Sequence, residues 1–258
     1  EEISVKAKTT TADTIKQHFC IVPARQKLDL LTRILEAEDF EATLIFVRTK
    51  IATVELANKL NARGYNCSAL NGDIAQRSRE KIIEQLKSGK TDIVVATDVA
   101  ARGLDVEKIS HVINFDIPSD TESYVHRVGR TGRAGRDGDA ILFVTPREKN
   151  MLNMIERATK KRIEPLKLPT PEEIQDKRAG KLKSEIQNIL AKDDLKDQRN
   201  FVKLCQHDCV ISTSDIAAAL LKLVQIDPSL FTKNSPQKDE KLDFVTDSFE
   251  GSRDRRQP

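Results

Sequence analysis

The chain has 258 residues, of which 38% are hydrophobic and 32% charged, and its formal net charge is +3. This length accommodates one large domain or two smaller ones, and so small a net charge is weak evidence for nucleic acid binding. Aromatic residues make up 4% and tryptophan is absent, which argues against a single-strand binder that stacks bases on aromatic side chains.

Cysteine usage and apolar patterning bear on the cellular setting. The four cysteines are too few and too scattered for a disulfide framework. The sequence shows no signal peptide and no apolar run long enough to span a bilayer. We therefore expect a cytoplasmic protein. Because the chain begins with Glu1 and ends in a charged segment, we also expect it to be a piece of a longer protein.

Residues 15–145 alternate short β-branched runs with amphipathic stretches. Strands are expected at Leu44–Val47, Ile93–Ala96, His111–Phe115 and Ala140–Val144. Helices are expected at residues 27–38, 51–63, 76–88 and from Pro146 to about Lys161. This alternation predicts a parallel sheet with helices on both faces, so functional loops should follow the carboxyl ends of the strands.

The prolines between Pro165 and Pro171 indicate a linker to a region of helices only. Thr170 is expected to cap a first helix, a second is marked by Phe201, and a third covers Ser212–Ile226. Three helices in about sixty residues form a small core, so this region should pack on another surface or on its own copy. The expected domains are 1–163 and 164–232, followed by a flexible, charged tail at 233–258.

The segment His126–Arg136 (HRVGRTGRAGR) is the strongest functional candidate. Arginines recur at every third position from Arg127 to Arg136, with glycines between them. We expect the helix over Ser123–Val128 to end here and a loop to present the guanidinium groups, which bind phosphate bidentately. The alternative is a solvated basic loop or a generic RNA-binding arginine–glycine tract, which the ordered strand that follows disfavours.

A second segment, Ala96–Val106 (ATDVAARGLDV), directly follows an expected strand. Asp98 and Asp105 offer carboxylates, and a carboxylate in such a loop can accept hydrogen bonds from ribose hydroxyls. In an alternative interpretation, Asp98 caps a helix and Arg102 is its partner. Two weaker segments, LIFVRTK at 44–50 and LNGDIAQRSRE at 70–80, place basic residues at strand ends and helix starts, where they can contact a nucleic-acid backbone.

In this order and spacing, the four segments resemble the motifs of the second RecA-like domain of DEAD-box RNA helicases. The resemblance covers about residues 1–160. Residues 160–232 resemble, more loosely, the dimerisation region of the bacterial cold-shock members of the DeaD/CsdA type. The resemblance implies a RecA-like parallel sheet flanked by helices, then a small all-α domain. It also implies an ATP-dependent RNA helicase that acts in cold shock, ribosome assembly or mRNA turnover.

The resemblance assigns roles to individual positions. Arg130 and Arg133 match arginines that contact the γ-phosphate of ATP, His126 matches the residue that couples to the DEAD box, and Asp105 matches the ribose-binding carboxylate. Positions that match RNA-backbone contacts are Arg48, Gly72, Asp73, Arg79, Thr97, Arg102 and Gly103. Implied partners are RNA, the protein's own first RecA-like domain, a second copy bound through residues 170–232, and ribosomal particles or the RNA-decay machinery.

A complete ATPase site is not found in the sequence. Gly89-Lys90-Thr91 looks like the end of a P-loop, but the earlier glycine that this motif needs is Glu84. No Asp-Glu-Ala-Asp occurs. In the family both elements lie on the first RecA-like domain, which would hold most of the ATP and Mg²⁺. We therefore expect little ATP hydrolysis by this chain alone. No metal site is predicted, because Cys205 and Cys209 lack a second ligand pair.

Two other functions remain open at this stage. The chain could be an assembly module, as the small helical region suggests, or a plain RNA-binding protein without an ATP role. The second alternative gives no purpose to Asp105 or His126.

Overall fold

The computed structural model describes residues 14–192, 194–209 and 211–223. These residues fall into two compact units, and the boundary between them in the chain lies between Leu168 and Pro169. Within the described part of the first unit, seven strands form one parallel sheet in the order β3-β4-β2-β5-β6-β1-β7. The strands are β1 (Ile15–Ile21), β2 (Ala42–Phe46), β3 (Cys67–Leu70), β4 (Ile93–Ala96), β5 (Ile109–Asn114), β6 (Gly138–Val144) and β7 (Glu164–Pro165).

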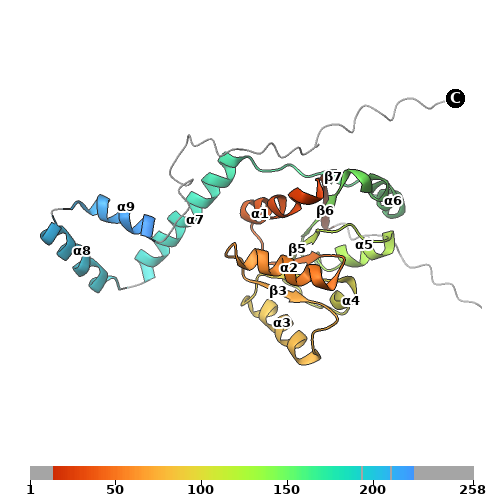
Figure 1. The fold of residues 1–258 in the computed structure, drawn as a ribbon, viewed down its shortest axis with the longest axis horizontal. Coiled ribbons are helices and arrows are strands. Elements are labelled where there is room, and N and C mark those ends of the chain that lie inside the picture. The colour runs from red at the N-terminus through yellow and green to blue at the C-terminus, as the bar shows by residue number, and fades with distance from the viewer. Residues whose placement is uncertain (1–13, 193, 210, 224–258) are drawn as a thin grey trace, which may run out of the picture. The chain divides into compact units, whose positions relative to one another are not determined.

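Helices cover both faces of this sheet (Figure 1), as the alternating pattern predicts. The helices of the first unit are α1 (Lys27–Ala37), α2 (Lys50–Asn61), α3 (Gln76–Ser88), α4 (Asp98–Ala101), α5 (Thr121–Val128) and α6 (Lys149–Thr159), with 3-10 turns at Ala24–Gln26 and Pro146–Glu148. One face packs on α1 and α2, and the other packs on α3, α4, α5 and α6.

The side-chain alternation of the strands builds these two cores. In β2, Ile45 contributes to the core under α1 and α2, while Leu44 and Phe46 contribute to the core on the opposite face. Successive side chains of a strand point to opposite faces, so a continuous apolar run supplies both cores at once. The fold class expected from the sequence is therefore confirmed.

The four expected runs correspond to β2, β4, β5 and β6, and the segment at 70–80 begins where β3 ends, so β1 and β7 are the strands that the sequence does not indicate. The polar residues Lys16, Gln17 and His18 interrupt β1 and hide it from a pattern based on apolar runs. Even so, β1 pairs along its whole length with β6. β7 has only two residues and pairs with His18 and Phe19. Both strands owe their place to partners far away in the sequence.

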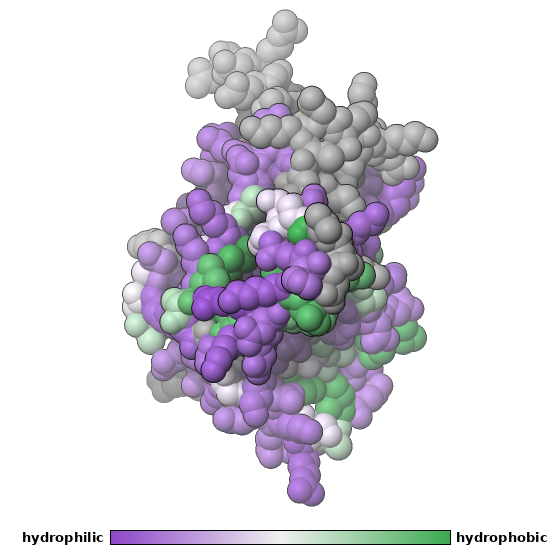
Figure 2. Space-filling view, turned by 90° about the vertical axis from the view of Figure 1, so that its left-hand side faces the viewer, coloured by the Kyte–Doolittle hydropathy of each residue, from purple (hydrophilic) through white to green (hydrophobic). Residues whose placement is uncertain are grey.

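The second unit contains α7 (Pro171–Lys192), α8 (Lys196–Cys209) and α9 (Thr213–Leu223). Thr170 caps α7 as expected: its hydroxyl accepts from the backbone of Glu173, whose carboxylate accepts from the backbone of Thr170. Many large apolar side chains of these helices are exposed. Figure 2 shows hydrophobic residues in green among hydrophilic ones in purple. The expected tail at 233–258 lies outside the described residues.

Candidate functional site

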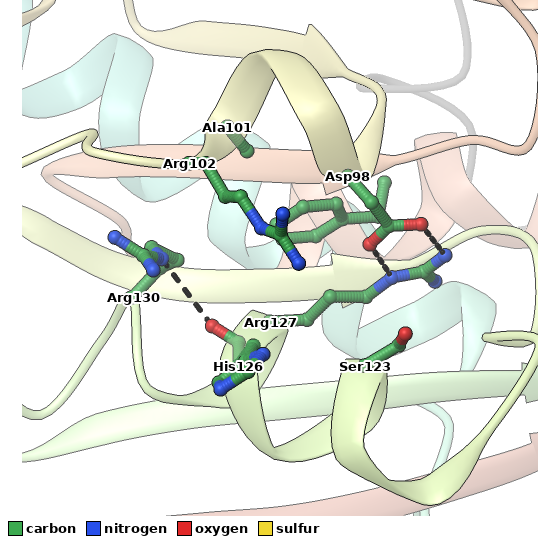
Figure 3. A pocket seen from close by; sticks show the side chains of 8 residues that line it. Asp98, Ala101, Arg102, Ser123, His126, Arg127 and Arg130 are labelled. Atoms are coloured by element: carbon green, nitrogen blue, oxygen red, sulfur yellow. Dashed lines mark hydrogen bonds and ion pairs between the residues drawn. The ribbon is translucent and has the colours of Figure 1, made fainter.

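Arg127 is the structural centre of the site. Its guanidinium donates to both carboxylate oxygens of Asp98, at 2.6 and 2.8 Å (Figure 3). It also donates to the Asn114 side chain at 3.2 Å and to the Asp116 carbonyl at 2.7 Å. The guanidinium carbon lies 5.0 Å from the centre of the Phe46 ring. One side chain, only 3% exposed, thus joins the ends of β2, β4 and β5.

This burial corrects two expectations. Arg127 lies on the expected helix, but α5 turns its guanidinium into the protein, so it is not presented to phosphate with the other arginines of the segment. The partner of Asp98 is Arg127 rather than Arg102, and the N-cap of α4 is Thr97 rather than Asp98. Arg136, at the other end of the series, forms an ion pair with Glu41.

Arg130, Arg133 and Asp105 form a second cluster. Both arginines donate to the Leu104 carbonyl, at 3.1 and 3.2 Å, and Arg133 also forms a 2.6 Å ion pair with Asp105. Partial burial and the neighbouring Arg133 charge lower the pKa of Arg130, while Asp105 opposes that shift. Both arginines nevertheless carry a positive charge at neutral pH, as arginines in proteins do. Two cations and one carboxylate therefore meet at one place.

This cluster does not lie at the carboxyl ends of the strands, where the rule for parallel sheets places functional loops. The Thr131 hydroxyl, between the two arginines, donates to the Ile109 carbonyl at 2.7 Å, and Ile109 begins β5. The cluster thus lies beside the amino ends of β5 and β6, not at the carboxyl ends of strands. The reason is that α5 follows the carboxyl end of β5 and runs back across the sheet before the loop begins. Only the candidates that directly follow β2, β3 and β4 obey the rule.

One glycine of the loop, Gly132, lets the loop backbone pack closely against the rest of the protein. Gly132 has a φ of +65°, and a Cβ atom there would lie 2.5 Å from Cγ1 of Ile15. The loop backbone therefore approaches β1 closely at this position. This contact holds the loop, and Arg130 and Arg133 with it, against the sheet.

His126 lies on α5 between these two clusters. It is exposed and lines a hollow together with Asp98, Arg102 and Arg130. The hollow measures about 40 Å³, room for roughly three waters but not for a nucleotide. Figure 3 shows Arg102 entering it from the end of α4 and Arg130 donating to the His126 carbonyl. A nucleotide would therefore need a second surface facing this one.

Two of the RNA candidates follow β3. Asp73 forms an ion pair with Lys50, and Gly72 lies beside the same lysine: a Cβ at Gly72 would be 3.5 Å from its Cε. The backbone of Asp73 donates to the buried Asn71 side chain, which also donates to Thr53 on α2. Lys50 is a site candidate that the sequence-based selection omits, because only the fold brings it to Gly72 and Asp73.

Four more RNA candidates surround the short helix α4. The Arg79 guanidinium donates to the carbonyls of Ala100 and Arg102, at 2.7 and 2.9 Å, and so holds the end of the helix. Arg102 and Gly103 are exposed there, and Gly103 has a φ of +75°. Thr97, at the start of α4, is 9% exposed.

Arg48, the seventh RNA candidate, follows β2 at the same edge of the sheet. It is exposed, its backbone donates to the Asp116 carboxylate at 2.9 Å, and its guanidinium lies 3.6 Å from Glu148. Six of the seven RNA candidates thus lie in the segments that follow β2, β3 and β4, and the remaining one, Arg79, lies on α3 and contacts the end of α4.

Comparison with known proteins identifies the family. Residues 26–135 match the family described as the helicase conserved C-terminal domain, and residues 169–235 match the RNA helicase DeaD dimerization domain. The chain is 47% identical over 245 residues to the ATP-dependent RNA helicase DeaD of Mycobacterium tuberculosis, covering 92% of this chain and 43% of that protein. It therefore spans less than half the length of this curated relative.

Solved structures agree with this assignment. The structure of the Escherichia coli DEAD-box protein SrmB bound to regulator of ribonuclease activity A is similar with a TM-score of 0.57 and 37% identity. The match covers 60% of this chain and 91% of that one. The chain belongs to the DEAD-box helicase family. Another member, Saccharomyces cerevisiae Dbp5 bound to RNA and ADP BeF3, matches with a TM-score of 0.59 and 32% identity, over 67% of this chain and 46% of that one.

The structure accounts for the P-loop-like run Gly89-Lys90-Thr91. Gly89 is not part of a P-loop: it ends α3 in the left-handed conformation, with a φ of +75°. Among the described residues, no group of three or more histidine, cysteine or acidic side chains is placed to hold a metal. No described helix is long and apolar enough to cross a membrane.

Proposed function

We propose that this chain is the C-terminal motor half of an ATP-dependent RNA helicase. In this proposal the ATPase site forms when a first RecA-like domain, carrying the P-loop and the DEAD box, closes on the face formed by α4, α5 and the loop after α5. The observation that supports it most strongly is the cluster of Arg130, Arg133 and Asp105 beside the exposed His126. The setting would be cytoplasmic.

The residues of the cluster fit one side of ATP. Two guanidinium groups suit the charge that develops on a transferring phosphate, and Asp105, which is 84% exposed, suits ribose hydroxyls. Arg133 and Asp105 pair with each other. On binding, ATP would replace this ion pair, with its phosphate contacting Arg133 and its ribose contacting Asp105. An exposed ion pair contributes only about 0–1 kcal/mol, so the exchange costs little. The magnesium would be held mainly by the first domain.

The decisive experiment joins the chain to its first RecA-like domain and measures RNA-stimulated ATP hydrolysis. We expect Arg133→Ala to lower the rate by about a thousandfold or more. Arg136→Ala is the matched control: it removes an arginine three residues away that pairs with Glu41, and it should leave the rate nearly unchanged. Equal rates for the two variants would refute the assignment of Arg133.

The same protein tests the alternative of a plain RNA binder. If ATP and Arg133 act as proposed, RNA affinity should change when a non-hydrolysable nucleotide is added. An affinity that is indifferent to nucleotide would favour the plain RNA binder, in which the second cluster has no role.

Homodimer formation through residues 170–232 is a second proposed function. Its support is the exposed apolar surface of the second unit, where Phe201 is 64% and Leu204 is 57% exposed, together with the match to a dimerization family. Other exposed apolar side chains there are Ile186, Ile189, Leu190, Ile211, Leu220 and Leu223. Patches of this kind mark protein interaction sites.

A further inference from the structure

An open basic hollow lies at the carboxyl end of α6, outside every segment assigned above. Its volume is about 550 Å³, within the range of roughly 300–1,000 Å³ that is usual for ligand pockets. The lining residues are Asn153, Glu156, Arg157, Lys160, Lys161 and Arg162. Four of these six side chains are cations and one is an anion.

Three of the four cations of the hollow have no ion-pair partner among the described residues. Arg157, Lys160 and Arg162 are exposed and form no ion pair with any described side chain. The Glu156 carboxylate accepts the backbone N–H of Ile163 at 3.1 Å, so it serves to fix the turn. A helix carboxyl end attracts cations in its last turn, but Arg162 lies beyond that turn.

Helix α6 connects this hollow to the proposed RNA edge. The helix starts next to Glu148, whose carboxylate lies 3.6 Å from Arg48. Lys149, Asn153, Arg157 and Lys160 then follow at spacings of three and four residues, which place them on one side of a helix. The 11 residues of α6 extend roughly 16 Å, a distance that a few nucleotides can span.

Asn153 is the residue of the hollow that could distinguish RNA from DNA. Its Oδ1 atom is buried and has no hydrogen-bond partner among the described residues. A buried carbonyl oxygen without a donor costs free energy until a donor reaches it. A rotation of the side chain that exposes this atom to the hollow would let a ribose 2′-hydroxyl donate to it, and DNA lacks that group.

From these observations we propose that the exposed side of α6 and the basic hollow at its end form a second RNA-backbone site. An RNA strand that leaves the segments after β2, β3 and β4 (the motor face) at Arg48 continues along α6, where Arg157, Lys160 and Arg162 bind its phosphates and Asn153 accepts from a ribose hydroxyl. This inference rests on the proposed RNA function and deepens it, since it gives the strand a direction beyond the motor face.

The test measures binding of a fluorescein-labelled RNA hairpin with a single-stranded tail to the 258-residue chain without nucleotide. The variant Arg157→Glu/Arg162→Glu should raise Kd about tenfold or more and reduce the slope of log K against log salt by roughly 1.5. Lys59→Glu/Lys87→Glu is the matched control, since both lysines are exposed in the last turns of α2 and α3. The control should change Kd less than about twofold.

Asn153→Ala leaves the charge unchanged and tests whether the hollow distinguishes RNA from DNA. It should weaken binding of the RNA hairpin but leave the affinity for a DNA hairpin of the same sequence unchanged. Arg48→Glu/Arg102→Glu reports on the motor face separately. If this last variant loses RNA and the α6 variant does not, the second site is wrong while the proposed function survives.

Other results would also overturn the inference. If the α6 variant and its lysine control lost equal amounts of RNA affinity, the change in net charge alone would account for the loss. If the α6 variant lost affinity for polyglutamate but not for RNA, the hollow would serve an acidic protein segment. If the unmodified chain did not bind the hairpin at all, both the second site and the RNA role of the motor face would fail.

Discussion

At the scale of single residues, the four arginines of one repeating segment have three different environments. Arg127 is buried among Asp98, Asn114 and Phe46, Arg130 and Arg133 share the Leu104 carbonyl, and Arg136 pairs with Glu41. A period of three residues cannot distinguish them. The difference arises because the first arginine is still on α5, facing the sheet, whereas the others lie in the loop that follows.

Arg127→Ala should lower the free energy of unfolding by about 3 kcal/mol, because it leaves a cavity and removes the donor to the buried Asn114 side chain. Asp98 is 42% exposed, so water compensates in part for the lost ion pair. Arg136→Ala should cost less than about 1 kcal/mol. Urea denaturation of both variants checks this, and similar losses would mean that Arg127 is not the structural centre of the site.

At the scale of elements, α5 is a short helix that carries both His126 and Arg127. Its start is fixed by Asp120, whose carboxylate accepts from the backbone of Ser123 at 2.7 Å. That hydrogen bond to the backbone of Ser123 is the main reason that the pKa of Asp120 is lowered. Capping here determines the direction of the helix that places the site.

Asp120→Ala should lower the free energy of unfolding by about 1 kcal/mol at neutral pH. Because the pKa of the carboxyl is lower in the folded state, its contribution is complete above the ordinary aspartate value of about 3.9 and is lost as pH falls through the folded-state pKa. The difference between the two proteins should therefore shrink in acid. Asp120→Asn should retain most of the stability, since asparagine caps equally well. A constant difference at all pH values would contradict this role.

At the scale of the whole molecule, neither unit is complete in the proposed function. The first unit presents the cluster proposed to bind phosphate but has no P-loop sequence, and the second exposes apolar side chains that a small core leaves uncovered. Each unit is therefore proposed to act against another surface: a first RecA-like domain for one, a second copy of the chain for the other.

Light scattering at high micromolar concentration checks the second of these proposals. We expect a dimer for the unmodified chain and a monomer for Phe201→Ser/Leu204→Ser, because burial of two such side chains supplies about 1.5–3 kcal/mol each. Arg199→Ser/Lys203→Ser changes exposed polar positions of the same helix and should remain dimeric. A monomeric unmodified chain, or a dimer that persists in the apolar variant, would rule out this interface.

The sequence by itself determined the parallel sheet, the helical unit, the cap at Thr170, and the segments that contain the site candidates. These features depend on residues close together in the chain, through hydrophobic period, capping and glycine placement. Only the tertiary structure decided that Arg127 pairs with Asp98, that Lys50 joins Gly72 and Asp73, and that the ends of α4 and α5 carry the phosphate cluster to the amino edge of the sheet. It also showed the basic hollow on α6. Contacts between residues so far apart depend on how strands and helices pack, and no local pattern of side chains specifies that packing.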